Sequence, residues 1–184
     1  MGSEVPDYLD VQMRLLGRVI YNSAAMESTL CDAFCSLVGS KFAAIVAAGQ
    51  SVTWLIEQCR ALTDAHREMS QESREAIKAA LNHCSSANEK RNHVFHGVKT
   101  AVAVDDGSFA TIKSRSRKYR PMIQNWTPET LQEVTLELAH ATSELFGAIQ
   151  AAVSPHMMVI GDALGWEDHL AQGGQSGKVS PLDH

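Results

Sequence analysis

The chain has 184 residues, of which 45% are hydrophobic, 20% are charged and 6% are aromatic, and its formal net charge is −5. This composition is that of an ordinary globular domain and excludes collagen-like and disulfide-dense proteins. The longest clear apolar run, residues 42–48, is far shorter than the roughly 18 residues that a membrane-spanning helix requires. Residues 4–10 are acidic and lack the basic and apolar regions of a secretory signal, so we expect a reducing, cytoplasmic setting and no membrane partner.

Charge is unevenly distributed along the chain. Residues 84–120 carry 8 basic and 3 acidic side chains, whereas residues 1–83 carry 7 and 10, and residues 121–184 carry 1 and 8. One basic segment inside an acidic protein indicates a local anionic partner rather than a general affinity for nucleic acid.

Most of the chain is expected to be helical, because apolar residues recur every three or four positions over long stretches. Four helices are predicted, over residues 8–38, 42–65, 71–95 and 127–153. Gly39 ends the first helix, and Gly49 is a weak point within the second. The fourth helix begins at Thr127 and Pro128, because a capping hydroxyl followed by proline is a typical helix start.

Between the third and fourth helices the apolar period changes from helical spacing to alternation. The alternating residues are Val98, Thr100, Val102 and Val104. They are followed by Asp106-Gly107 and then by residues 109–113, a pattern that predicts a β-hairpin turning at Asp106-Gly107. The predicted fold class is therefore mainly α, a bundle of four to five helices with a β-hairpin inserted between the third and fourth long helices. The glycine-rich residues 161–184 are expected to form a flexible C-terminal tail.

The four cysteines, Cys31, Cys35, Cys59 and Cys84, do not show the two-residue spacing of a zinc knuckle or a redox pair. We interpret them as small core residues. Cys31 and Cys35 lie one helical turn apart, so a metal site that combines them with His83 or Cys84 is the alternative.

The third helix places polar residues on an apolar stripe. The stripe follows steps of three and four and consists of Ile77, Leu81, Cys84, Asn88, Arg91 and Phe95. A buried arginine is costly unless it meets an anion, so Arg91 requires either an acidic partner, such as Glu27 or Glu57, or a ligand. His96 follows five positions after Arg91, about 140° around an ideal helix, so either the last turn distorts or a second subunit completes a shared site.

Residues 88–97 resemble the signature of the HEPN superfamily, which is an arginine, commonly followed by asparagine, with a histidine five positions after the arginine. Arg91, Asn92 and His96 match these elements, and Gly97 is a common accompaniment. The resemblance covers residues 8–157 and implies a helical domain over residues 1–160, of which residues 98–120 form a basic hairpin arm.

The resemblance implies a metal-independent endoribonuclease without a cofactor, with Arg91, Asn92 and His96 as catalytic residues. Histidine titrates near neutral pH and suits proton transfer, whereas the guanidinium fork of arginine matches phosphate oxygens. One motif supplies one certain histidine, so a homodimer with a composite active site is expected. Members of this family act as toxins or in antiviral defence, and many pair with a separately encoded antitoxin.

The basic arm is the predicted RNA-binding surface. Its candidate residues are Lys113, Arg115, Arg117, Lys118, Tyr119 and Arg120. The alternating basic residues would track a phosphate backbone and the tyrosine would stack on a base, with single-stranded RNA as the expected target. The alternative is a solvated strand edge that charge keeps soluble.

Two other functional interpretations remain open from the sequence. The first is a non-catalytic HEPN-like module that dimerises or binds a partner protein, a nucleotide or RNA. The second is a metal-dependent hydrolase built on His83, Cys84, His93 and His96, which is weaker because no carboxylate follows at a familiar ligand spacing.

Overall fold

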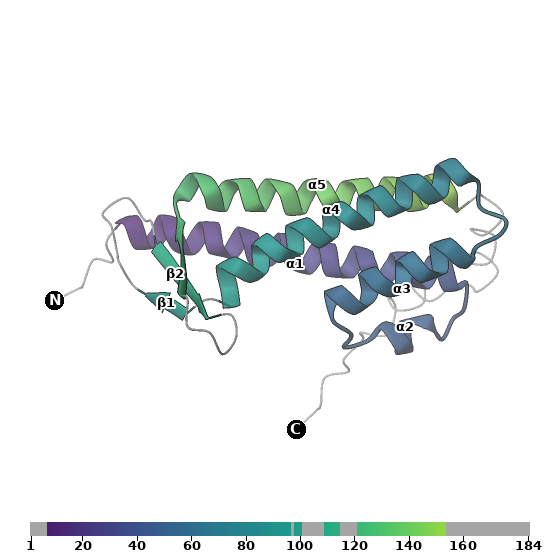
Figure 1. Ribbon diagram of the computed structural model, residues 1–184, viewed down its shortest axis with the longest axis horizontal. Coiled ribbons are helices and arrows are strands. Elements are labelled where there is room, and N and C mark those ends of the chain that lie inside the picture. Colours follow the sequence, from purple (N-terminus) through teal and green to yellow (C-terminus); the bar gives the residue numbers. More distant parts are fainter. Residues whose placement is uncertain (1–6, 97, 101–108, 115–120, 154–184) are drawn as a thin grey trace, which may run out of the picture. The chain divides into compact units, whose positions relative to one another are not determined.

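The structure is a computed structural model and describes residues 7–96, 98–100, 109–114 and 121–153. In chain order its elements are α1 (Asp7–Val38), α2 (Ala43–Ala47), α3 (Val52–Ala65), α4 (Gln71–His96), β1 (Val98–Thr100), β2 (Phe109–Ser114), β3 (Pro121–Trp126) and α5 (Pro128–Ala152). Figure 1 shows that helices make up most of the described chain, which confirms the prediction of a mainly α fold.

The core lies between α1, α4 and α5, with α3 packed against α1 and α4. Side chains with no exposed surface come from all four helices: Val19, Met26, Leu30, Leu55, Cys59, Ile77, Leu81, Cys84, Leu131, Leu138 and Leu145. Most of these residues recur every three, four or seven positions, so each helix turns one continuous apolar stripe inward. Burial of these stripes is the main force that assembles the bundle.

The predicted second helix is wrong as a single element, because it is interrupted between α2 and α3. Gly49 adopts a φ of 73°, a left-handed conformation that is accessible to glycine and incompatible with a continuing α-helix. The Ser51 hydroxyl then accepts a hydrogen bond from the backbone N–H of Trp54 at 3.2 Å, which caps α3. The interruption brings the start of α3 to a defined position beside α1 and α4.

The predicted start of α5 is confirmed. The Thr127 hydroxyl accepts a hydrogen bond from the backbone N–H of Thr130 at 3.3 Å, and the Thr130 hydroxyl accepts one from the Thr127 N–H at 2.8 Å. Two N–H groups that have no partner inside the helix are thereby satisfied. Pro128 occupies the first helical position, where a backbone N–H is not needed.

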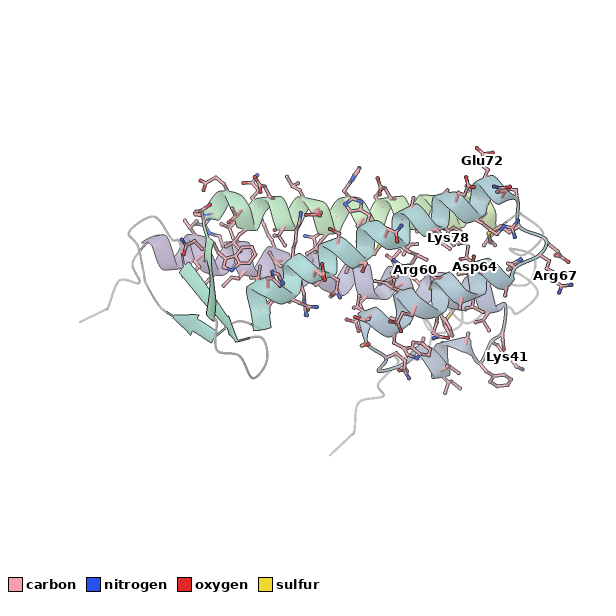
Figure 2. The ribbon with its side chains drawn as sticks, viewed as in Figure 1. Lys41, Arg60, Asp64, Arg67, Glu72 and Lys78 are labelled. Carbon is pink, nitrogen blue, oxygen red and sulfur yellow. The ribbon has the colours of Figure 1, made fainter. Side chains whose placement is uncertain are left out.

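Polar contacts join α3 to α4 along their solvent-facing sides. The Arg60 guanidinium donates a hydrogen bond to the side-chain oxygen of Asn82 at 2.7 Å, and Lys78 forms an ion pair with Asp64. Figure 2 shows Asp64 and Lys78 facing each other between the two helices. Because these groups are exposed, such pairs contribute at most about 1 kcal/mol each, and the helices are held mainly by their apolar contacts.

Three strands lie between α4 and α5 in the chain and form a sheet in the order β1-β2-β3 with antiparallel pairing. Val98 is opposite Ile112, and Ile112 is opposite Ile123. β3 is not expected from the sequence, because Pro121–Trp126 lacks a clear alternation of apolar and polar residues. The turn predicted at Asp106-Gly107 lies outside the described residues, so the hairpin itself stays a prediction.

The boundaries of the predicted helical domain at residue 160 and of the tail over residues 161–184 also lie outside the described residues. Among the helices that the structure describes, none combines the length and the apolar character needed to cross a bilayer.

Candidate functional site

Arg91 lies near the end of α4 and is partly buried. Its Nη1 donates a hydrogen bond to the side-chain oxygen of Asn92 at 3.0 Å, and its guanidinium carbon lies 5.3 Å from the centre of the Phe95 ring. The Nε atom of Arg91 is buried and has no hydrogen-bond partner among the described residues. A buried donor without an acceptor costs roughly 1–3 kcal/mol, so the hydrogen-bonding capacity of Arg91 is not fully used within the described part of the chain.

The guanidinium borders a pocket of about 290 Å³, which we call the Arg91 pocket. Three separate parts of the chain line it: α1, the start of α3 and the second half of α4. The lining residues are Ser23, Met26, Glu27, Gln50, Ser51, Val52, Thr53, Asn88, Arg91 and Asn92. A second pocket of about 310 Å³ shares Thr53, Asn88 and Asn92 with the first. The two pockets therefore form adjoining hollows between α3 and α4.

Two further features of the Arg91 pocket favour an anion. Val52 and Thr53 are the first residues of α3, and the first N–H groups of a helix have no partner within it and carry the positive end of the helix dipole. Asn88 also lines the pocket, is only 7% exposed, and makes no side-chain hydrogen bond to any described residue. A cation, a helix N-terminus and an unpartnered carboxamide thus converge on one hollow.

The ion-pair interpretation of Arg91 is wrong for the part of the chain that the structure describes. Glu27 lines the same pocket but forms no ion pair with Arg91, and Glu57 lines only the second pocket. Among the described residues, no carboxylate lies within ion-pair distance of the Arg91 guanidinium. Glu27 is exposed to water, which weakens its repulsion of an anion in the pocket.

The three motif residues are placed on the same helix but not all in one pocket. Arg91 and Asn92 line the Arg91 pocket, and Asn92 also lines the second pocket together with His93. The backbone of α4 is α-helical up to His96, its last residue, and the side chain of His96 lies outside the described part. In a regular helix, positions five residues apart are separated by about 140° around the axis.

Of the six candidate RNA-binding residues, the structure describes only Lys113. Lys113 belongs to β2, opposite Met122 of β3. Arg115, Arg117, Lys118, Tyr119 and Arg120 lie outside the described residues. The alternation of these basic residues on one strand face stays a prediction.

Among the described residues, the cysteines do not come together with histidines or carboxylates as a metal site would require. Burial raises the pKa of Cys59 and Cys84 to about 12, and the pKa values of Cys31 and Cys35 are also raised, chiefly by burial. All four are free thiols, and the Cys84 thiol donates to the backbone oxygen of Ala141 at 3.6 Å. Since a metal binds the thiolate, the interpretation of these cysteines as core residues is favoured.

Alkylation should distinguish the cysteines in the folded protein. With a pKa of about 12, only about one Cys59 or Cys84 thiol in ten thousand is ionised at pH 8, and both are enclosed. We expect iodoacetamide to modify the partly exposed Cys31 and Cys35 first. Cys59 and Cys84 should react only after guanidinium chloride has unfolded the chain. Peptide mass spectrometry over time measures this order, and equal rates for all four in the native state would contradict the packing.

Sequence reasoning missed one cluster of titratable side chains, formed by His83 of α4 with His140 and Glu144 of α5. The four-residue spacing of His140 and Glu144 is the signal within the sequence, since it places both on one face of a helix. His83 joins them only because α4 packs on α5, which the sequence does not reveal. The predicted hydrolase site, by contrast, includes the buried Cys84 and is not assembled among the described residues.

Comparison of the chain with protein-family models, curated proteins and solved structures finds no match.

Proposed function

We propose that the protein is a metal-independent endoribonuclease of the HEPN type and that the Arg91 pocket binds a phosphodiester of single-stranded RNA. The observation that carries the proposal is the Arg91 guanidinium, which borders an open pocket with no carboxylate partner among the described residues. Arg91 and the N-terminus of α3, which both line the pocket, provide complementary donors for phosphate oxygens.

The proposed reaction is an internal transfer of the phosphoryl group from the 5′-oxygen of one nucleotide to the 2′-oxygen of its neighbour. The ribose 2′-oxygen attacks the neighbouring phosphorus, the bond to the 5′-oxygen breaks, and the products carry 2′,3′-cyclic phosphate and 5′-hydroxyl ends. A base removes the proton of the 2′-hydroxyl and an acid returns one to the 5′-oxygen. Arg91 stabilises the charge that builds up on the phosphate, and Asn92 positions the phosphate or orients His96.

Two copies of His96 would supply the base and the acid. The regular helix up to His96 supports this assignment, because the angle between Arg91 and His96 favours a site completed by a second chain over a site within one chain. We therefore propose a homodimer in which the ends of the two α4 helices meet across one groove. The basic residues at 113–120 of the hairpin arm would guide the RNA strand towards it.

The biological setting follows from the same proposal. A small ribonuclease of this type would act in the cytoplasm as a toxin or an antiviral-defence effector, under the control of a separately encoded antitoxin.

A non-catalytic helical module that binds a partner is the second candidate. The observation in its favour is the apolar surface of α2 and the residue before it, where Phe42, Ile45 and Val46 are 60%, 74% and 51% exposed. Adjacent exposed apolar side chains are typical of a contact surface. This candidate predicts stable association without any RNA cleavage.

RNA cleavage in the presence of a chelator tests the proposal. We expect the full-length protein with EDTA to cleave a labelled single-stranded RNA and to leave cyclic phosphate ends, identified by product mass. An RNA with a 2′-deoxy substitution at the cleaved position is the matched control and should stay intact, because it lacks the attacking group. Cleavage of the deoxy substrate, or stable binding of RNA without cleavage, would contradict the proposed chemistry.

A further inference from the structure

A group of three metal-ligating side chains lies on the α4 and α5 surface, apart from the Arg91 pocket. Glu144 is central to it: one carboxylate oxygen lies 2.7 Å from Nδ1 of His83, and the other lies 3.5 Å from Nδ1 of His140. The two imidazole rings meet edge to face, with centroids 5.5 Å apart. One ligand atom from each of the three residues lies within 4.8 Å of the others.

This arrangement differs from an ordinary surface ion pair in its composition. An ion pair needs one cation and one anion, whereas here a single carboxylate lies between two imidazoles whose nitrogens are metal ligands when neutral. The Glu144 carboxylate supplies oxygen ligands within reach of both imidazoles, at 2.7 Å from Nδ1 of His83 and 3.5 Å from Nδ1 of His140. Two nitrogens and one anionic oxygen make a ligand set that suits Zn²⁺.

We propose that His83, His140 and Glu144 form a zinc-binding site that links α4 to α5. Ligand atoms around a tetrahedral zinc ion lie about 3.4 Å apart, so the widest separation must shorten by rotation of a side chain. His140 is free to rotate because its side chain is 69% exposed, whereas His83 is 27% exposed and defines the α4 side of the site. Three protein ligands leave a fourth position for water.

The proposed site is separate from the proposed nuclease chemistry. His83 precedes Arg91 by eight residues, about 12 Å along α4, and His83 does not line the Arg91 pocket. Zinc binding would therefore stabilise the pairing of α4 with α5 and would take no part in a metal-independent cleavage of RNA.

Titration of the full-length protein with zinc, after removal of metals with a chelator, tests this site. We expect calorimetry to show one ion bound per chain and thermal unfolding to shift to higher temperature with zinc, because the ion binds the folded state. Co²⁺ in place of zinc should give the visible absorption of a tetrahedral site. His83→Ala and Glu144→Gln should each weaken zinc binding about tenfold or more.

Matched variants separate this site from other histidines and carboxylates. His66→Ala removes a histidine at the end of α3, and Glu133→Gln removes an exposed carboxylate from α5, and both should bind zinc as the unaltered chain does. Because all three proposed ligands are at least partly exposed, the unfolding temperature without zinc should change little in the variants. Absence of zinc binding, or equal affinity in His83→Ala and the unaltered chain, would overturn the proposal.

Discussion

Replacing Arg91 by alanine is expected to lower the rate of RNA cleavage by about 100-fold or more, because it removes the one cation that lines the pocket among the described residues. Arg91→Lys should retain intermediate activity, since lysine keeps the charge but loses the two parallel donors that match phosphate. The fold should be preserved, because among the described residues Arg91 contributes only a hydrogen bond to Asn92 and a ring contact with Phe95. Cleavage rates of labelled RNA, with circular dichroism of each variant, measure both effects.

Arg74→Ala is the matched control for the loss of a positive charge from α4. Arg74 lies near the start of the helix, about 25 Å from Arg91 along its axis, and does not line either pocket. Its removal should leave cleavage nearly unchanged. If Arg91→Ala cleaves RNA as fast as the unaltered chain and remains folded, the phosphate-binding role of Arg91 is wrong.

The helices could be predicted because their signals are local. The stripe from Ile77 to Asn88 is buried as its spacing predicts, and the cap at Thr127 forms the expected hydrogen bonds. The break at Gly49 is a local signal of another kind: glycine weakens a helix, but only the packing around it decides whether the chain turns there. In this fold α2 and α3 both pack on α1, which a single straight helix over residues 42–65 would not achieve.

The candidate site could be predicted only in part, for a related reason. Arg91 and Asn92 stand out because a charged residue interrupts an apolar stripe, and this signal lies within one helix. The start of α3 and Glu27 of α1 reach the same pocket through tertiary packing, and their sequence positions give no hint of it. The same holds for His83, which meets Glu144 across a separation of 61 residues in the chain.

Leu81 lies in the core of the bundle, so its truncation is expected to have a large effect on stability. Its side chain has no exposed surface, and α4 contacts both α5 and α3. Leu81→Ala should lower the free energy of unfolding by about 2–5 kcal/mol, because it removes buried apolar surface and leaves a cavity. Urea unfolding followed by circular dichroism measures the loss.

Leu136→Ala is the matched control, because Leu136 lies on α5 and is 61% exposed. This substitution should change the free energy of unfolding by no more than about 0.5 kcal/mol. Domains of this size have total stabilities of about 5–15 kcal/mol, so Leu81→Ala consumes a large share of the total. Ile77→Val, one turn earlier on the same stripe, should lower the free energy of unfolding by only about 0.5–1.5 kcal/mol. It allows a buried position to be compared with Leu136 even if Leu81→Ala does not fold. Equal losses at Leu81 and Leu136 would mean that this face of α4 is not buried in the core, and the pocket that depends on the position of α4 would then lose its support.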